Sequence, residues 1–241
     1  MEVKGNRLFQ KNHLSKKNST IIISVNLILS IKFAEVMLFD YIKTNYNAGE
    51  PILLQNIELD MKYDNLCQQI KKLVDKGSLC RYMEGVYYLP KKTVSGLPYT
   101  ISADKIAKLK YIENKTSRYG CYTGHTLANM MGLSEQVPQV KEIVSNKTSA
   151  VTRTVRIGKI SYIVRKSTVT ITEENAKAVM LLEILKDVDN LSDIHINASK
   201  CLKDYISKNR IAKAIVDTLI PNYPLRTYKA IYDMELTGVF T

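Results

Sequence analysis

A short segment in the first third of the chain carries side chains that can read DNA bases. Its amide and amine groups belong to Asn65, Gln68, Gln69, Lys71 and Lys72. The amides of Asn and Gln can form two hydrogen bonds with the edge of an adenine, and Lys can bind phosphates or guanine. The segment therefore indicates a contact with DNA.

A helix is needed to present these side chains on one surface. Apolar residues at helical spacing lie between the polar ones: Leu66, Ile70, Leu73 and Val74. Asp64 can cap the start of this helix, and Gly77 can end it. Asn65, Gln68 and Lys72 fall opposite the apolar stripe and the other two polar residues on its flanks, so all five are expected to be exposed. The alternative is an ordinary surface helix, which shows the same pattern.

A short hairpin is expected directly after the helix. Residues 79–82 alternate like a strand, Met83–Gly85 forms a turn, and Val86–Leu89 returns before Pro90 ends the pairing. Three cations flank this hairpin: Arg81, Lys91 and Lys92. Contacts with the DNA backbone are expected there.

Helix and hairpin complete a larger pattern. Apolar spacing predicts a first helix over residues 31–46, and residues 52–57 form a short extended or helical piece. Helix, short element, helix and hairpin follow one another in this order in a winged helix-turn-helix. Residues 37–94 are therefore predicted to be an N-terminal winged helix-turn-helix domain that binds DNA.

Most of the positive charge lies outside this domain. Lys and Arg number 35 against 23 Asp and Glu, which gives a net charge of +12 and favours an anionic partner. The net charge is +4 over residues 1–36, +1 over 37–94, +8 over 95–170 and −1 over 171–241. The section 95–170 is thus the electropositive part of the chain.

Residues 95–170 predict a mixed α/β middle region. Ser102 and Thr123 can each cap a helix, and two β-rich stretches joined across Gly158–Lys159 predict a β-hairpin. The hairpin region carries five cations and no acid: Arg153, Arg156, Lys159, Arg165 and Lys166. Such a cluster is typical of a phosphate-facing surface, although a solvated strand face is the alternative. Arg153, Arg156 and Lys159 are the candidate DNA contacts of this region.

Residues 171–241 predict a C-terminal helical bundle. A helix from Glu173 to about Val188 is apolar almost all round, as a buried central helix is, and amphipathic helices follow. The bundle either closes the middle region or offers a surface for dimerisation, and its residues do not separate these roles. The fold class expected for the whole chain is α+β: a winged helix-turn-helix, a mixed α/β region with a β-hairpin, and a helical bundle.

The sequence gives no support for catalysis or for a cofactor. Its four cysteines form no CxxC pair, and the histidines His13, His125 and His195 are isolated, so neither a metal site nor a catalytic triad is predicted. Phosphate-binding and dinucleotide-binding glycine motifs are lacking. We therefore expect a non-enzyme without cofactor or metal, kept reduced in the cytoplasm.

The first 36 residues form an N-terminal extension to these domains. The basic stretch Lys11–Lys17 precedes the apolar run Ile21–Ile31, which superficially imitates a secretory signal. Asn26 interrupts the run, no small-residue cleavage site follows it, and eleven residues are too few to span a bilayer. The run is either an extra element packed on the next domain or lies upstream of the true translation start at Met37. No membrane association is expected.

Several phrases of the sequence resemble the AbiEi antitoxin family. They are YGCYTGHTLANMMGLSEQVP at Tyr119–Pro138, Ser145–Asn146, TVRIG at Thr154–Gly158, and the segment Lys71–Lys92 with its GVYYLP. The likeness covers roughly residues 37–190. AbiEi proteins are the transcriptional-regulator halves of type IV toxin–antitoxin operons of the AbiE type.

The resemblance implies a repressor of its own operon with a C-terminal antitoxin region, residues 95–241, that opposes a nucleotidyltransferase-like toxin encoded beside it, whether or not the two proteins form a complex. The helical bundle of residues 171–241 then either closes the middle region, serves the antitoxin function or offers a dimer surface. It places Asn65, Gln68, Lys71 and Lys72 where the family's recognition helix lies. The extra N-terminal residues depart from the family pattern. Two alternatives stay open from the residues alone: a winged-helix regulator that responds to a small ligand, and a winged-helix protein-interaction module that does not bind DNA.

Overall fold

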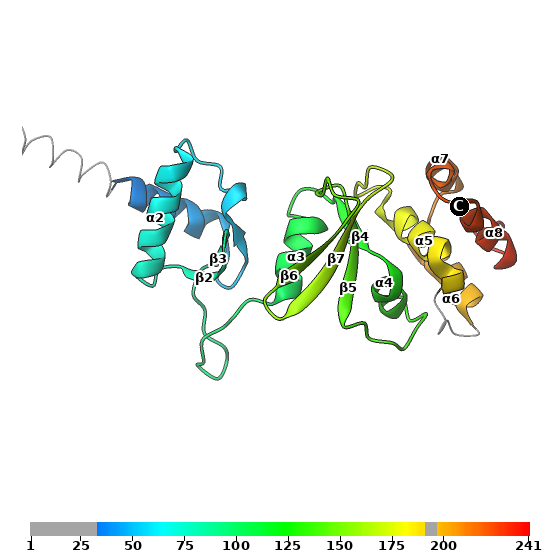
Figure 1. The fold of residues 1–241 in the computed structure, drawn as a ribbon, viewed down its shortest axis with the longest axis horizontal. Helices are drawn as coiled ribbons and strands as arrows, with labels where there is room; N and C mark the ends of the chain where they lie inside the picture. Colours follow the sequence, from blue (N-terminus) through cyan, green and yellow to red (C-terminus); the bar gives the residue numbers. More distant parts are fainter. Residues whose placement is uncertain (1–32, 191–196) are drawn as a thin grey trace, which may run out of the picture. The chain divides into compact units, whose positions relative to one another are not determined.

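The computed structural model describes residues 33–190 and 197–241 and shows a mixed α+β fold. The predictions for residues 1–32, including the apolar run, lie outside the described residues. The chain divides into two compact units, Met1–Ile101 and Ser102–Thr241 (Figure 1). Each unit has its own core and is described by itself. No helix in the described part of the chain is long and apolar enough to cross a membrane.

The first unit combines helices with a three-stranded antiparallel sheet. A helix at 33–45 is followed by β1 (Ile52–Leu53), the 3-10 helix η1 (Leu54–Asn56), α2 (Tyr63–Asp75), β2 (Cys80–Met83) and β3 (Val86–Tyr88). The strand order β1-β3-β2 places β3 in the centre, where it pairs with both neighbours. The helix predicted over 31–46 and the hairpin after α2 are therefore present.

The sequence predicted the end of α2 correctly but not the residue that caps its start. The helix begins after Lys62, which has no side-chain capping bond, and Asp64 lies inside the first turn. The prediction that Asp64 caps the helix was therefore wrong, although a carboxylate in the first turn still stabilises a helix through its dipole. Gly77 has a φ of +72° directly after the last turn, as predicted for a helix end.

Apolar side chains from both helices, from β1 and from the segment between α2 and β2 form the core of this unit. They include Leu38, Ile42, Ile52, Ile70, Leu73 and Leu79. The apolar stripe of α2 therefore packs inward, and this packing fixes which side of the helix faces solvent.

The second unit begins with a four-stranded mixed sheet flanked by helices. Its elements are α3 (Ala103–Tyr111), β4 (Gly120–Tyr122), α4 (Gly124–Met130), β5 (Val140–Ser145), β6 (Thr152–Ile157) and β7 (Ile160–Lys166). The strand order is β4-β5-β7-β6, with β5 and β7 parallel and the other pairs antiparallel. Ile157 pairs with Ile160, so the predicted turn at Gly158–Lys159 is present.

The capping predictions in this unit had different outcomes. The Ser102 hydroxyl accepts a hydrogen bond from the Lys105 N–H, as expected of a capping residue at the start of α3. Thr123 occupies the corresponding position of α4, but its hydroxyl donates instead to the buried carboxylate of Glu183 at 2.7 Å. Lys186 also binds this carboxylate, at 2.6 Å, so the buried charge is compensated.

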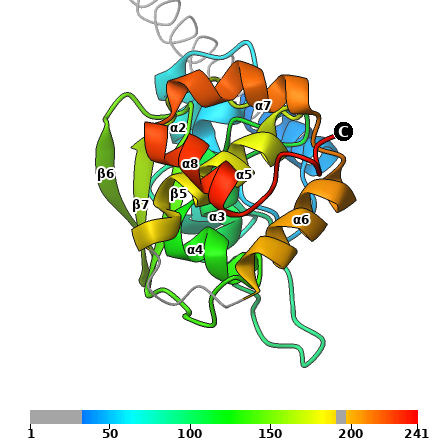
Figure 2. The ribbon, with the colours of Figure 1, turned by 90° about the vertical axis from the view of Figure 1, so that its right-hand side faces the viewer.

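The remaining helices complete the second unit. They are α5 (Ala176–Asp187), the 3-10 helix η2 (Val188–Asn190), α6 (Ala198–Asn209), α7 (Lys213–Leu219), the 3-10 helix η3 (Ile220–Asn222) and α8 (Leu225–Asp233). As its all-round apolar pattern predicts, α5 lies in the middle and packs against α4, α6, α7 and α8 (Figure 2). One apolar core joins these helices to β4, β5 and α4, so the helical part and the sheet fold as one body.

Candidate nucleic-acid interface

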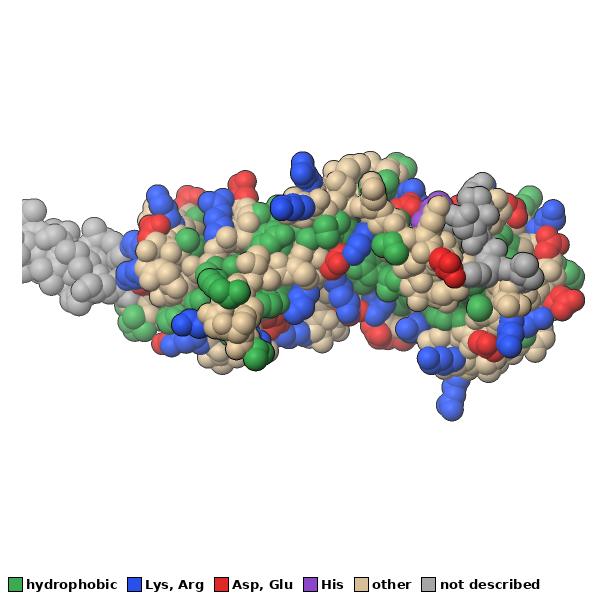
Figure 3. Space-filling model, turned by 90° about the horizontal axis from the view of Figure 1, so that it is seen from below, with side chains coloured by type: hydrophobic (Ala, Val, Ile, Leu, Met, Phe, Trp, Pro, Cys, Tyr) green, Lys and Arg blue, Asp and Glu red, His purple; other side chains and the backbone are tan. Residues whose placement is uncertain are grey.

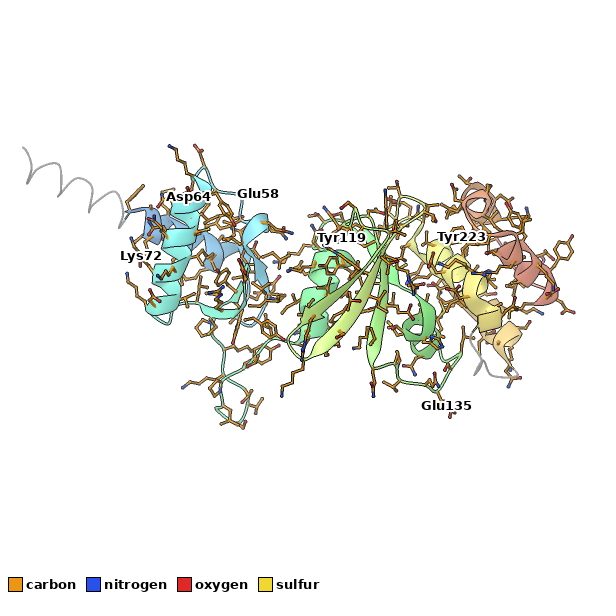
Figure 4. All side chains as sticks on the ribbon, in the orientation of Figure 1. Glu58, Asp64, Lys72, Tyr119, Glu135 and Tyr223 are labelled. Atoms are coloured by element: carbon orange, nitrogen blue, oxygen red, sulfur yellow. The ribbon has the colours of Figure 1, made fainter. Side chains whose placement is uncertain are left out.

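The exposed face of α2 is the starting point for a DNA-binding surface. Asp64, Gln68, Lys71 and Asp75 are exposed at spacings of four, three and four residues, which places them on one side of the helix. In Figure 4, Asp64 lies near the first turn of α2 and Lys72 nearer to the other end. The centre of the exposed face is therefore formed by Gln68 and Lys71.

Gln69 does not belong to this face. Its side chain is buried, with 1 % exposure, between the turns that carry Leu66 and Leu73. The expectation that Gln69 is exposed was wrong because Val74, which was counted in the apolar stripe, is only half-buried. The buried side of α2 is rotated toward Gln69, which lies three residues after Leu66 and four before Leu73.

Two other candidate residues lie on the shoulders of the exposed face. Asn65 is half-buried, and its Oδ1 accepts a hydrogen bond from Gln69 Nε2 at 2.8 Å. The Lys72 side chain is also half-buried, so it does not lie opposite the apolar stripe as expected. Both can reach a ligand from the side, whereas Gln68 and Lys71 point outward most directly.

The hairpin after α2 carries the cations expected near the DNA backbone. Arg81 is exposed on β2, and Lys91 and Lys92 are exposed after β3. The Lys91 ammonium lies 5.8 Å from the centre of the Tyr99 ring, a favourable cation–π distance that still leaves the charge in solvent. Glu84 occupies the turn between β2 and β3 and adds a negative charge there.

Charges in the first unit are balanced. Residues 33–101 contain eight Lys or Arg and eight Asp or Glu. In the face of the molecule drawn in Figure 3, cations are interspersed with acids and do not form one continuous patch. Any binding of DNA phosphates by this unit therefore depends on individual cations and not on its net charge.

The structure separates the cations of the β6–β7 hairpin. Side chains alternate between the two faces of a strand, so Arg153 and Arg156, three residues apart on β6, point to opposite faces. Arg153 turns toward α3, where its Nη2 donates to the Tyr111 hydroxyl at 3.2 Å and its guanidinium lies 5.4 Å from the centre of that ring. The expectation that these cations form one surface was therefore wrong.

The remaining cations of this hairpin also differ in their surroundings. Arg165 pairs with Glu142 at 2.7 Å, so its charge is compensated. Arg156, Lys159 and Lys166 are exposed, and among the described residues none of them forms an ion pair. These three are the cations of the hairpin that remain available to a phosphate.

The helix α3 adds positive charge on the side of Arg153. Burial, and in second place repulsion from Arg153, lowers the pKa of Lys110. Burial alone would raise the pKa of Asp104, but hydrogen bonds from Lys141 and Tyr162 outweigh it and lower that pKa. Asp104 therefore ties α3 to β5 and β7 as a carboxylate.

In residues 33–190 and 197–241 no three or more His, Cys, Asp or Glu side chains gather in a way that can hold a metal ion. The four cysteines are free, and burial raises the pKa of the Cys121 thiol, which disfavours its reactive thiolate form. The candidate interface is therefore the polar face of α2 together with the β2–β3 hairpin.

The chain matches the model of one protein family. Residues 40–213 match the model of a family of unknown function, DUF6088. The chain belongs to the DUF6088 family. No curated protein matches the chain. The region shared with DUF6088 contains α2 and both hairpins and ends at the first residue of α7, so α8 lies beyond it.

Proposed function

We propose that this protein binds the operator DNA of its own operon and represses transcription. The observation that carries the proposal is the arrangement of the first unit. Helix 33–45, η1, α2 and the β2–β3 hairpin, with strand order β1-β3-β2, follow the order of a winged helix-turn-helix. In this reading α2 is the recognition helix and the β2–β3 hairpin is the wing.

The side chains of α2 support base recognition. Gln68 can form two hydrogen bonds with an adenine edge, and Lys71, one turn away on the same face, can bind a guanine or a phosphate. Asn65 and Lys72 are positioned to contribute from the edges of that face. The acids Asp64 and Asp75 at its two ends limit the surface that can approach DNA to the middle of the helix.

Phosphate contacts come from cations outside α2. Arg81, Lys91 and Lys92 flank the wing, and Arg156 and Lys159 supply exposed charge in the second unit. Arg153 is a weaker candidate because it is engaged with Tyr111. Such contacts contribute affinity and orientation but carry no sequence information of their own.

We further propose that the protein is the antitoxin of a type IV toxin–antitoxin operon. The AbiEi-like phrases at Tyr119–Pro138 and Thr154–Gly158 support this assignment. The second unit would then oppose a nucleotidyltransferase-like toxin encoded in the same operon, with or without direct contact between the proteins.

Two experiments test the two parts of the proposal. A reporter fused to the DNA upstream of the gene should be repressed when the protein is supplied, and unchanged expression would contradict the repressor role. Growth arrested by expression of the adjacent gene should be restored by co-expression of the full chain. Continued arrest at normal antitoxin levels would contradict the antitoxin role.

A further inference from the structure

The C-terminal helices line an open pocket that the proposed DNA-binding surface does not use. Its volume is about 440 Å³, and α7, the first residue of η3, α8 and the residues after α8 form its walls. Figures 1 and 2 show these two helices and the chain end together on one side of the second unit. The walls are mainly apolar: Val216, Ile220, Tyr228, Ile231, Tyr232 and Phe240.

The wall contributed by the chain end is held in place. Thr241 accepts a backbone hydrogen bond from the Lys213 N–H at 2.9 Å and donates one to the Ile211 carbonyl at 3.2 Å. Leu236 is fully buried in the core below it. The pocket is therefore a feature of the folded unit, and a ligand does not have to order its walls first.

The aromatic side chains at the pocket remain available to a ligand. Tyr232 is 78 % exposed and Tyr228 39 % exposed, although both line the pocket. Apolar pockets of a few hundred Å³ are typical sites for small molecules, and the hydrophobic effect favours covering such side chains. An apolar group of a small molecule fits this lining.

Two ammonium groups lie at the same pocket. Lys213 pairs with Asp217 at 2.6 Å, and Lys229 lies 4.0 Å from Asp233. Both pairs join exposed residues one turn apart, a geometry that contributes little free energy. Either ammonium can therefore turn to an anion bound in the pocket. Of the charged side chains that line it, two are cations and one, Asp217, is an acid.

We propose that this pocket binds a small apolar carboxylic acid, such as a medium-chain fatty acid. The alkyl chain lies against Val216, Tyr228 and Tyr232, and the carboxylate pairs with Lys213 or Lys229. The pocket lies almost entirely beyond the region shared with DUF6088, whose match ends at Lys213. The proposed binding does not depend on whether α2 binds DNA.

Calorimetric titration of the full chain with octanoate tests the proposal. We expect saturable binding of one octanoate per chain, with butyrate much weaker because it covers less apolar surface. Octan-1-ol, which lacks the charge, should bind about fivefold more weakly than octanoate, as expected for loss of one exposed ion pair. Replacement of both lysines, Lys213→Ala with Lys229→Ala, should weaken octanoate binding to the level of octan-1-ol.

Two further variants distinguish binding in the pocket from non-specific binding to the protein surface. Tyr232→Ala removes an exposed part of the wall and should weaken both octanoate and octan-1-ol. Lys208→Ala removes an exposed lysine of α6 that does not line the pocket and should change neither. Absence of saturable octanoate binding, or equal binding by wild type and the Tyr232→Ala variant, would overturn the proposed site. Equal binding of octanoate and octan-1-ol would overturn the assignment of a carboxylic acid.

Discussion

Gln68 and Gln69 are neighbours in sequence and lie in opposite environments on α2. Gln68 is exposed, whereas Gln69 is buried and hydrogen-bonded to Asn65. Only one of the two amides can therefore meet a DNA base. The difference arises from the rotation of α2 about its own axis, which decides which residues face the core. The positions of the apolar residues in the sequence do not define this rotation closely enough to separate Gln68 from Gln69.

This division leads to a prediction for DNA binding. Gln68→Ala and Lys71→Ala should each weaken binding to the operator, with a loss of about 1–3 kcal/mol if Gln68 makes a bidentate contact. Gel-shift titration measures the effect. Gln136→Ala removes an exposed glutamine of the second unit and serves as the matched control. Equal affinity of the Gln68→Ala variant and wild type would rule out base reading by this residue.

The buried amide makes a separate prediction for stability. Gln69 Oε1 has no hydrogen-bond partner in the described part of the chain, and burying such an atom costs about 1–3 kcal/mol. Gln69→Leu should therefore raise the free energy of unfolding, by about 1 kcal/mol after the loss of the bond to Asn65. Urea denaturation checks this change, with Gln68→Leu as the exposed control. A lower midpoint for Gln69→Leu would show that the amide stabilises the fold.

At the scale of elements, the two arginines of β6 differ in their contacts. Arg156 is exposed to solvent, whereas Arg153 contacts Tyr111 of α3. Replacing Arg156 and Lys159 together by Ala should weaken binding to any DNA and reduce the slope of log affinity against log salt concentration by about 1–2. Arg153→Ala should instead destabilise the packing of β6 on α3, because Arg153 contacts Tyr111. An unchanged salt slope for the Arg156→Ala, Lys159→Ala variant would remove this hairpin from the DNA surface.

The contact of α3 with the sheet depends on an ionised carboxylate. The folded-state pKa of Asp104 is lowered below 3.8, so its contribution to stability is present above that pH and is lost as the pH falls below it. Asp104→Asn should cost at most about 1 kcal/mol near neutral pH, because the carboxylate is partly solvated. Denaturation at pH 7 and at pH 3 should show this difference shrinking in acid. A constant difference at both pH values would contradict an electrostatic role.

Local patterns in the sequence were enough to predict several elements. The stripe with a final glycine gave α2, alternation around a two-residue turn gave β6 and β7, and Ser102 gave the start of α3. The features that the sequence did not predict depend on contacts between residues far apart in the chain. The buried side of α2 includes Gln69 and leaves Val74 only half-buried, and the parallel pairing of β5 with β7 joins strands separated in sequence by β6.

Thr123 shows the same limit at the start of α4. Its residue type suits a helix cap, yet its hydroxyl bonds to Glu183, sixty residues later in the chain. The pocket of α7 and α8 was also missed, because its lining resembles an ordinary apolar helix face until the chain end folds against it.

On the scale of the whole molecule, the proposed base reading and the proposed electrostatic attraction to DNA involve side chains of different units. Residues 33–101 are balanced in charge, whereas residues 95–170 carry a net charge of +8. We therefore expect the first unit to supply sequence preference and the second to supply part of the salt-dependent affinity. The proposed repressor role would then depend on both units.

The most direct test of this account is a competition titration of the full chain by fluorescence anisotropy at physiological salt. Labelled DNA from upstream of the gene is competed with the same sequence unlabelled or with a scrambled duplex of equal length. We expect the unlabelled upstream DNA to compete at a concentration at least about 1,000-fold lower than the scrambled duplex, as for specific DNA-binding proteins. Equal competition by both duplexes, or no binding to the labelled DNA, would contradict a sequence-specific repressor.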